Sequence, residues 1–212
     1  MEHIVSIEKE KINEMPLVEY DGNIYIVDSM SQVNAAVAHL RKHPLIGFDT
    51  ETRPAFKRGE RHKLALIQLA TPSECFLFRT CKLQGIPLKL KEYLEDENCL
   101  KVGLSTPDDL HQMQRLCHEL RPEGFLEIQN MVTHYRITDL SLQKIFAILF
   151  GKKISKSQRL TNWEADELTP QQQRYAAIDA WACIDIYNNL MDGKFIPEKS
   201  PYYHQKEDEQ QT

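Results

Sequence analysis

Residues 45–51 read Leu-Ile-Gly-Phe-Asp-Thr-Glu, an apolar run that ends in two carboxylates. Such a run is typical of a buried β-strand, and side chains two residues apart on a strand point to the same face. Asp49 and Glu51 should therefore emerge side by side. Burying unpaired carboxylates is unfavourable, so a divalent cation is their natural partner, because hard cations prefer carboxylate oxygen atoms. The alternative is that the strand ends here and both acids are solvated.

A second stretch, RYAAIDAWACIDIY at residues 174–187, has strong helical character. Tyr175 and Asp179 are four residues apart, so they share one face of the predicted helix. The alanines around Asp179 would let this helix pack closely on a sheet. The alternative is an amphipathic helix in which Tyr175 and Asp179 only make structural hydrogen bonds.

The third stretch, KVGLSTPDDLHQM at residues 101–113, predicts a short strand that turns into a helix. Thr106 is the expected N-cap, with Pro107 at the first helical position. Asp108 and Asp109 then fall in the first turn, where negative charge is favoured by the helix dipole. Taken alone, this segment favours helix capping over chemistry.

The rest of the chain predicts one α/β domain with a mixed sheet over residues 1–199, in which the first 20 or so residues are peripheral. Strand character is found in residues 24–27, 45–51, 64–69, 75–78 and 99–103. Helical periodicity is found in residues 31–42, 88–94, 107–119, 129–135, 141–150 and 170–190. The tail at 200–212 is polar, and we expect it to be disordered.

In such a fold, four carboxylates from a strand, a helix start and a second helix can converge at one edge of the sheet. Such a convergence is typical of a site that holds two divalent ions for phosphoryl transfer.

Together the three stretches resemble the DEDD superfamily of 3′→5′ exonucleases, in its tyrosine branch, which includes the ribonuclease D and Werner-syndrome exonuclease domains. The motifs are IGFDTETRP followed by KLALIQLAT, then KVGLSTPDDL, then SLQKIFAILFG and NWEADELTPQQQRYAAIDAWACIDIY. They occur in this order between Leu45 and Tyr187. The resemblance implies a ribonuclease-H-like fold, a five-stranded mixed sheet flanked by helices. It also implies release of nucleoside 5′-monophosphates from the 3′ end, with two Mg²⁺ or Mn²⁺ ions.

The resemblance also implies a role for each residue. Asp49 resembles the ligand that bridges the metal ions, and Glu51 the second acid of the first motif. Asp109 resembles the acid on the ion nearer the leaving group, and Asp179 the last ligand, on the ion that activates water. Tyr175 resembles the tyrosine that orients this water.

The second motif departs from the family's pattern. Many members have His-Asn before its acid, whereas this chain has Leu104-Ser105-Thr106-Pro107. The doublet Asp108-Asp109 leaves the identity of the ligand ambiguous. We choose Asp109, because the next residue is apolar and because its spacing from Gly103 fits the Werner-type motif.

Two basic segments are candidates for contact with the phosphate backbone of a substrate. The segment at residues 151–159 has four positive charges and no acid, namely Lys152, Lys153, Lys156 and Arg159. A second loop follows Glu51 and contains Arg53, Lys57, Arg58, Arg61 and Lys63. For either segment, the alternative is a solvated loop. Trp163 could stack on a base, whereas Trp181 is better explained as a core residue.

Composition narrows the class of protein. The N-terminus lacks the pattern of a signal peptide, and no apolar run reaches the roughly 18 residues of a membrane span. The five cysteines have no C-x-x-C spacing, which argues against a disulfide framework. We therefore expect a soluble, cytoplasmic protein with reduced cysteines. The net charge of −5 does not exclude binding of nucleic acid, because local charge at a groove matters more than the total.

Three functional classes remain. The first is an active exonuclease on DNA or RNA, free-standing and without an evident obligate protein partner. The second is an inactive relative that binds nucleic acid, and loss of a motif acid would indicate it. The third is an endonuclease of ribonuclease-H type, against which the position of Tyr175 argues.

Overall fold

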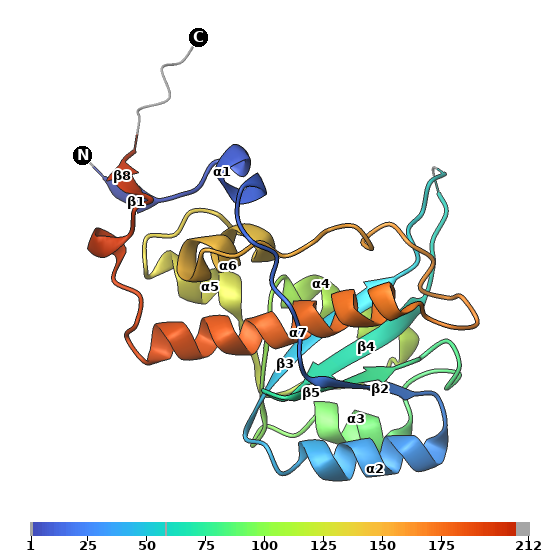
Figure 1. The fold of residues 1–212 in the computed structure, drawn as a ribbon. Coiled ribbons are helices and arrows are strands. Elements are labelled where there is room, and N and C mark those ends of the chain that lie inside the picture. The colour runs from blue at the N-terminus through green and yellow to red at the C-terminus, as the bar shows by residue number, and fades with distance from the viewer. Residues whose placement is uncertain (1, 58, 207–212) are drawn as a thin grey trace.

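The computed structural model describes residues 2–57 and 59–206, which form a mixed α/β fold around one large sheet (Figure 1). The six strands of this sheet lie in the order β2-β5-β4-β3-β6-β7. Their bounds are β2 Asn23–Val27, β3 Leu45–Thr52, β4 Leu64–Ala70, β5 Glu74–Phe78, β6 Leu100–Gly103 and β7 Phe125–Glu127. The pairs β5/β4 and β4/β3 are antiparallel and the other three are parallel.

The expected five-stranded sheet was wrong by one strand, β7. This strand has only three residues, none of them fully buried, so it shows no alternation that a sequence could reveal. The five predicted strands are all present, with ends shifted by at most one residue.

Helices cover both faces of the sheet. Helices α2 (Met30–Leu40) and α3 (Leu88–Leu94) pack on one face, and α7 (Pro170–Met191) crosses the other, against β3 and β4. Figure 1 shows α7 over β3 and β4, with α2 and α3 on the far side of the strands. The remaining helices are α1 (Lys9–Asn13), α4 (Thr106–Leu116), α5 (Ile128–Thr133), α6 (Leu142–Phe150) and the 3₁₀ turn η1 (Pro197–Lys199).

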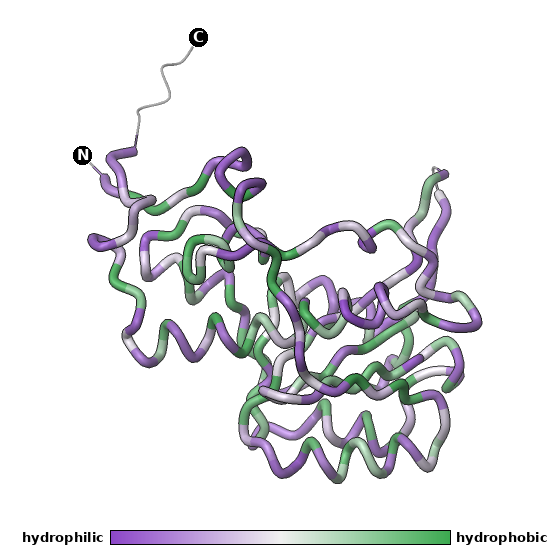
Figure 2. The backbone as a smooth tube through the Cα atoms, viewed as in Figure 1, coloured by the Kyte–Doolittle hydropathy of each residue, from purple (hydrophilic) through white to green (hydrophobic). Residues whose placement is uncertain are grey.

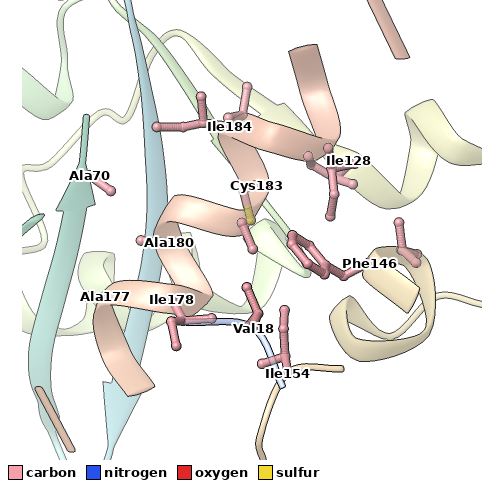
Figure 3. Packing of buried hydrophobic residues seen from close by; sticks show 14 of the residues in the cluster. Val18, Ala70, Ile128, Phe146, Ile154, Ala177, Ile178, Ala180, Cys183 and Ile184 are labelled. Atoms are coloured by element: carbon pink, nitrogen blue, oxygen red, sulfur yellow. The ribbon is translucent and has the colours of Figure 1, made fainter. Parts of the chain in front are cut away.

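Hydrophobic residues are frequent along the strands of the large sheet, and hydrophobic and hydrophilic residues alternate along α2 (Figure 2). Figure 3 shows α7 between the strand that carries Ala70 and the segments that carry Phe146 and Ile154. The core is thus divided by the sheet into two clusters, one on the α7 side and one on the α2 and α3 side.

The two ends of the described chain meet in a small separate sheet, in which β1 (His3–Val5) pairs antiparallel with β8 (Tyr203–Gln205). The disorder expected from residue 200 onward was therefore wrong for this strand. A three-residue strand gains its order from a partner about 200 residues away, which sequence periodicity cannot show. Residues 207–212 of the predicted tail lie outside the described residues.

Within the described ranges, no helix has both the length and the apolar character needed to cross a membrane. The five cysteines are all free thiols, as expected.

Candidate active site

The alternation of β3 divides its side chains between the two faces of the sheet. Ile46 and Phe48 are fully buried in the cluster beneath α2 and α3. Gly47, Asp49 and Glu51 consequently face α7. The apolar half of the strand thus fixes the direction in which its two carboxylates point.

Helix α7 brings Asp179 to those carboxylates. Single oxygen atoms of Asp49, Glu51 and Asp179 all lie within 4.8 Å of one another, and Asp179 is buried. The helix approaches closely because residue 47 has no side chain, and a β-carbon there would lie 2.0 Å from the carbonyl oxygen of Ala180. Thr169 and Gln172 start the helix with a capping box.

Asp109 lies on the other side of β3, in the first turn of α4. The hydroxyl of Thr50 donates a hydrogen bond of 2.5 Å to its Oδ1. Asp109 is half-buried, whereas Asp108 is exposed. Asp109 is outside the group of three carboxylates, but its charge raises the pKa of both Asp49 and Glu51.

The start of α4 differs from the prediction. Ser105, not Thr106, is the N-cap, and it has the left-handed values φ 63° and ψ 28° without a side-chain capping bond. The backbone N–H groups of Ser105 and Thr106 donate instead to the carboxylate of Glu127, at 3.1 and 2.6 Å. The prediction of Thr106 as the N-cap was wrong, because the acceptor for the first N–H groups is the carboxylate of Glu127, which comes from a distant segment.

Burial raises the pKa of all four acids, and the charges of neighbouring acids add to this effect at Asp49 and Glu51. Burial first, and then the charges of Asp179 and Asp109, raise the pKa of Glu51 to about 9. Burial raises the pKa of Asp109 and of Asp179 to about 7, and the same cause, with three neighbouring acids, holds the pKa of Asp49 well above its ordinary value.

No Lys, Arg or His in the described ranges forms an ion pair with any of these four acids. A set of buried carboxylate oxygen atoms without a basic partner fits divalent cations, which prefer oxygen ligands and would offset the repulsion.

Tyr175 lies one helical turn before Asp179 and lines the same cavity. Its pKa is raised well above the ordinary value, first by burial and then by the charges of Asp179 and Glu51. A hydrogen bond with Tyr175 in turn lowers the pKa of Asp179 against the larger effect of burial. The hydroxyl of Tyr175 therefore keeps its proton and can donate a hydrogen bond, but it cannot serve as a base near neutral pH.

The basic segment at 151–159 is divided by the fold. Arg159 lines the cavity of about 220 Å³ that contains Asp49, Glu51, Tyr175 and Asp179. Lys156 and Arg159 both line an adjoining cavity of about 400 Å³ that shares Tyr175 and Asp179.

The other two lysines of this segment lie elsewhere. Lys153 donates from Nζ to the backbone carbonyl of Asn13 at 2.5 Å, against the N-terminal segment. Lys152 is exposed, and neither lysine lines the two cavities. The structure thus brings only Lys156 and Arg159 to the acids.

The second basic loop follows β3. Arg53 forms an ion pair of 3.5 Å with Glu164, which links this loop to the segment before α7. Arg61 and Lys63 line a separate cavity of about 230 Å³ together with Arg115 of α4. Lys57 is exposed, and Arg58 lies outside the described residues.

The tryptophans do not offer exposed stacking surfaces. Trp163 is fully buried, with its ring centroid 6.0 Å from that of Tyr175. Trp181 packs against Tyr20 and Phe146, which agrees with its interpretation as a core residue.

Two residues of the site were missed by the sequence analysis, Thr50 and Glu127. Thr50 lies between the two acids of the first motif, so its place on the opposite face of the strand was available as a signal. Glu127 has no such signal, because it follows a strand that the sequence did not reveal.

Comparison with known proteins agrees with this architecture. The family model described as 3′-5′ exonuclease matches residues 24–193. The chain is 30% identical over 185 residues to the bifunctional 3′-5′ exonuclease/ATP-dependent helicase WRN of Mus musculus, which covers 83% of this chain and 13% of that protein. It is 31% identical over 163 residues to exonuclease 3′-5′ domain-containing protein 2 of Drosophila melanogaster, which covers 74% of this chain and 27% of that protein.

Solved structures share the fold. The EXO domain of Aedes aegypti Nibbler superimposes with a TM-score of 0.74 at 24% identity, covering 86% of this chain and 96% of that chain. Escherichia coli RNase D superimposes with a TM-score of 0.70 at 25% identity, covering 80% of this chain and 44% of that chain.

The chain spans less than a third of the two curated relatives described above. Its fold is ribonuclease-H-like, with a six-stranded mixed sheet flanked by helices. With the family model matched over residues 24–193, the chain belongs to the 3′-5′ exonuclease family of the DEDD superfamily.

Proposed function

We propose that this chain is an active, metal-dependent 3′→5′ exonuclease that releases nucleoside 5′-monophosphates from the 3′ end of DNA or RNA. The observation that carries the proposal is the convergence of Asp49, Glu51 and Asp179 within 4.8 Å, in a cavity that Tyr175 and Arg159 also line. The relatives whose names include 3′-5′ exonuclease support the reaction class.

Asp49, Glu51, Asp109 and Asp179 would hold two divalent ions, Mg²⁺ or Mn²⁺. When bound, such ions lower the pKa of a water molecule and stabilise the departing 3′ oxygen. Asp49 has the central place in this set, because the charges of the other three acids all act on it. Asp109 lies on the far side of β3 from Asp179, so these two acids suit different ions.

Tyr175 orients the attacking water in this proposal. Its hydroxyl stays protonated at neutral pH and lies beside Asp179, so it can donate a hydrogen bond to the water oxygen while a carboxylate accepts a proton. Removal of that donor leaves all four carboxylates in place, although it takes away the hydrogen bond that lowers the pKa of Asp179. The role is therefore positional and does not require Tyr175 to bind metal.

Lys156 and Arg159 hold the substrate's phosphates. Of the four basic residues in the segment at 151–159, these two line the cavities next to the acids. The charge of Arg159 lowers the pKa of Glu51 against the larger effect of burial, and that of Lys156 acts in the same way on Asp179. Positive charge thus lies where a phosphate must approach a strongly acidic site.

Two alternatives make different predictions. An inactive relative would bind nucleic acid without shortening it, but every acid of the three motifs is present in this chain. An endonuclease of ribonuclease-H type would cut a substrate that has no ends.

The test uses 5′-labelled single-stranded DNA, duplex DNA with a recessed 3′ end, and RNA, each with Mg²⁺ or Mn²⁺. We expect stepwise shortening from the 3′ end that stops with chelator and with Asp49→Ala. Shortening that persists under both conditions would overturn the metal mechanism. Binding without shortening of any substrate would identify an inactive relative, and cleavage of circular single strands would identify an endonuclease.

A further inference from the structure

Glu127 is the last residue of the short strand β7, and its carboxylate accepts four hydrogen bonds from two helix starts. Oε1 accepts from the backbone N–H groups of Ser105 and Gln129, at 3.1 and 2.8 Å. Oε2 accepts from the backbone N–H and the hydroxyl of Thr106, at 2.6 and 2.8 Å. Both oxygen atoms are thus used, and every partner is a donor.

These contacts replace the ordinary cap of helix α4. Ser105 occupies the N-cap position but has no side-chain capping bond, and its backbone is left-handed, a conformation that only glycine adopts freely. Such a conformation persists when surrounding contacts determine it. Here the carboxylate of Glu127 binds the N–H group of that same residue, and the amide of Gln129 donates to its hydroxyl at 3.2 Å.

The first turn of α4 contains Asp109, three residues after Thr106. Among the described residues, Thr50 is the hydrogen-bond partner of its carboxylate. The start of the helix therefore determines where Asp109 lies relative to Asp49 and Glu51. A displacement of about 1 Å at such a position can lower a rate by about 100-fold.

We propose that Glu127 is a positioning residue that sets the place of Asp109 in the metal site by holding the left-handed turn at Ser105. The inference rests on the proposed function. Glu127 itself is not a metal ligand here, because both of its oxygen atoms are occupied by backbone and hydroxyl donors. Its carboxylate is required as an acceptor on both sides, and an amide in its place would turn an NH₂ group toward an N–H donor.

The test compares Glu127→Gln with wild type and with Glu123→Gln, an exposed acid on the same segment. For Glu127→Gln we expect kcat on labelled single-stranded DNA or RNA, or the apparent Mn²⁺ affinity, to fall about 10- to 100-fold. The KM for the nucleic acid should change less than kcat, because Lys156 and Arg159 keep their places, while Ser105 and Gln129 line the same cavity. Glu123→Gln should match wild type, and Glu127→Asp should recover part of the loss.

The double variant of Glu127→Gln and Asp109→Asn distinguishes a positioning role from a role confined to stabilising the fold. If Glu127 acts through Asp109, Glu127→Gln should add no further loss of kcat in an Asp109→Asn background. If the losses of kcat in the two single variants multiply in the double variant, the inference is overturned. A Glu127→Gln variant with wild-type kcat and Mn²⁺ affinity would overturn it as well.

The Mn²⁺ affinity is measured by calorimetry on the folded variants, so this readout does not need a substrate. If wild type binds Mn²⁺ but shortens no nucleic acid, the proposed function fails, whereas the affinity of Glu127→Gln still tests the role of Glu127.

Discussion

The carbonyl oxygen of Ala180 lies 2.0 Å from the position that a β-carbon on residue 47 would occupy, so Gly47 and Ala180 set the distance between β3 and α7. Gly47→Ala should displace α7 and separate Asp179 from Asp49. We expect a loss of thermal stability and a fall in kcat of more than about 100-fold. Calorimetric unfolding and single-turnover rates on end-labelled DNA or RNA would measure both effects.

Because the obstacle at Gly47 is a backbone atom, Ala180→Gly should not rescue Gly47→Ala. Restored activity in the double variant would show that the side chain of Ala180, and not its carbonyl, limits the approach. Wild-type kcat in Gly47→Ala alone would contradict the argument.

Asp109 and Asp108 should behave differently. Asp109 receives the hydroxyl of Thr50 beside the acids, whereas Asp108 is exposed. We expect Asp109→Asn to lower kcat by at least about 100-fold and to weaken Mn²⁺ binding. Asp108→Asn should retain kcat within about twofold. The reverse order of the two variants, measured on the same labelled oligonucleotide, would assign the ligand to Asp108.

In EDTA, the free energy of unfolding of the metal-free protein should fall as pH rises. The pKa of Glu51 is raised to about 9 and those of Asp109 and Asp179 to about 7, above the roughly 4 of unfolded acids. Acids with raised pKa values stabilise the fold fully below about pH 4, and this contribution is lost as pH rises toward 9. Denaturant midpoints in EDTA at pH 5, 7 and 9 should therefore decrease.

The matched variant for this pH series is Glu51→Gln, which should show a shallower decrease because it lacks one of the titrating groups. Saturating Mn²⁺ should stabilise the protein more at pH 9 than at pH 5, because the cation binds the deprotonated acids. A midpoint in EDTA that rises between pH 5 and pH 9 would refute the assignment of these pKa shifts.

Tyr175→Phe should separate chemistry from metal binding. Loss of the hydroxyl should lower the single-turnover rate by roughly 100-fold, in the range typical of one positioned hydrogen-bond donor. The Mn²⁺ affinity should stay within about threefold. Tyr187→Phe on the same helix is the control and should match wild type. If Tyr175→Phe abolishes Mn²⁺ binding, the hydroxyl is part of the metal site and the water-orienting role is wrong.

Lys156 and Arg159 should affect substrate binding. Replacing either residue with Ala should raise KM several-fold and reduce the dependence of KM on salt by about one phosphate contact. Lys42→Ala, at the end of α2 on the opposite face, is the control. Lys152→Ala and Lys153→Ala should have smaller effects than Arg159→Ala. Equal effects from all four basic residues would support the prediction that the whole segment binds substrate.

The sequence reveals those parts of the site that lie within single elements. Asp49 and Glu51 follow from the period of a strand, and Tyr175 and Asp179 from the period of a helix. Glu127 could not be predicted in the same way. Its partners Ser105 and Thr106 are more than 20 residues away in the chain, and its strand is too short to show alternation.

The same limit applies to the fold. The long strands and helices were predicted because their buried faces repeat at a regular period. Strands β1 and β8 are each three residues long and obtain their order from each other across almost the whole chain. Lys153 shows the corresponding limit for function, because its charge suggested a substrate contact while its neighbour Asn13 was visible only in three dimensions.

The alternation of β3 has a consequence for folding. Asp49 pairs with Gln68 and Glu51 with Leu66 across the antiparallel ladder. A slip of this strand by one residue would exchange the faces, so that both acids entered the apolar layer under α2 while Phe48 faced α7. The misaligned form would have no metal site and an untenable core. The proposed metal site and the correct alignment of this strand therefore depend on the same short stretch, residues 48–51.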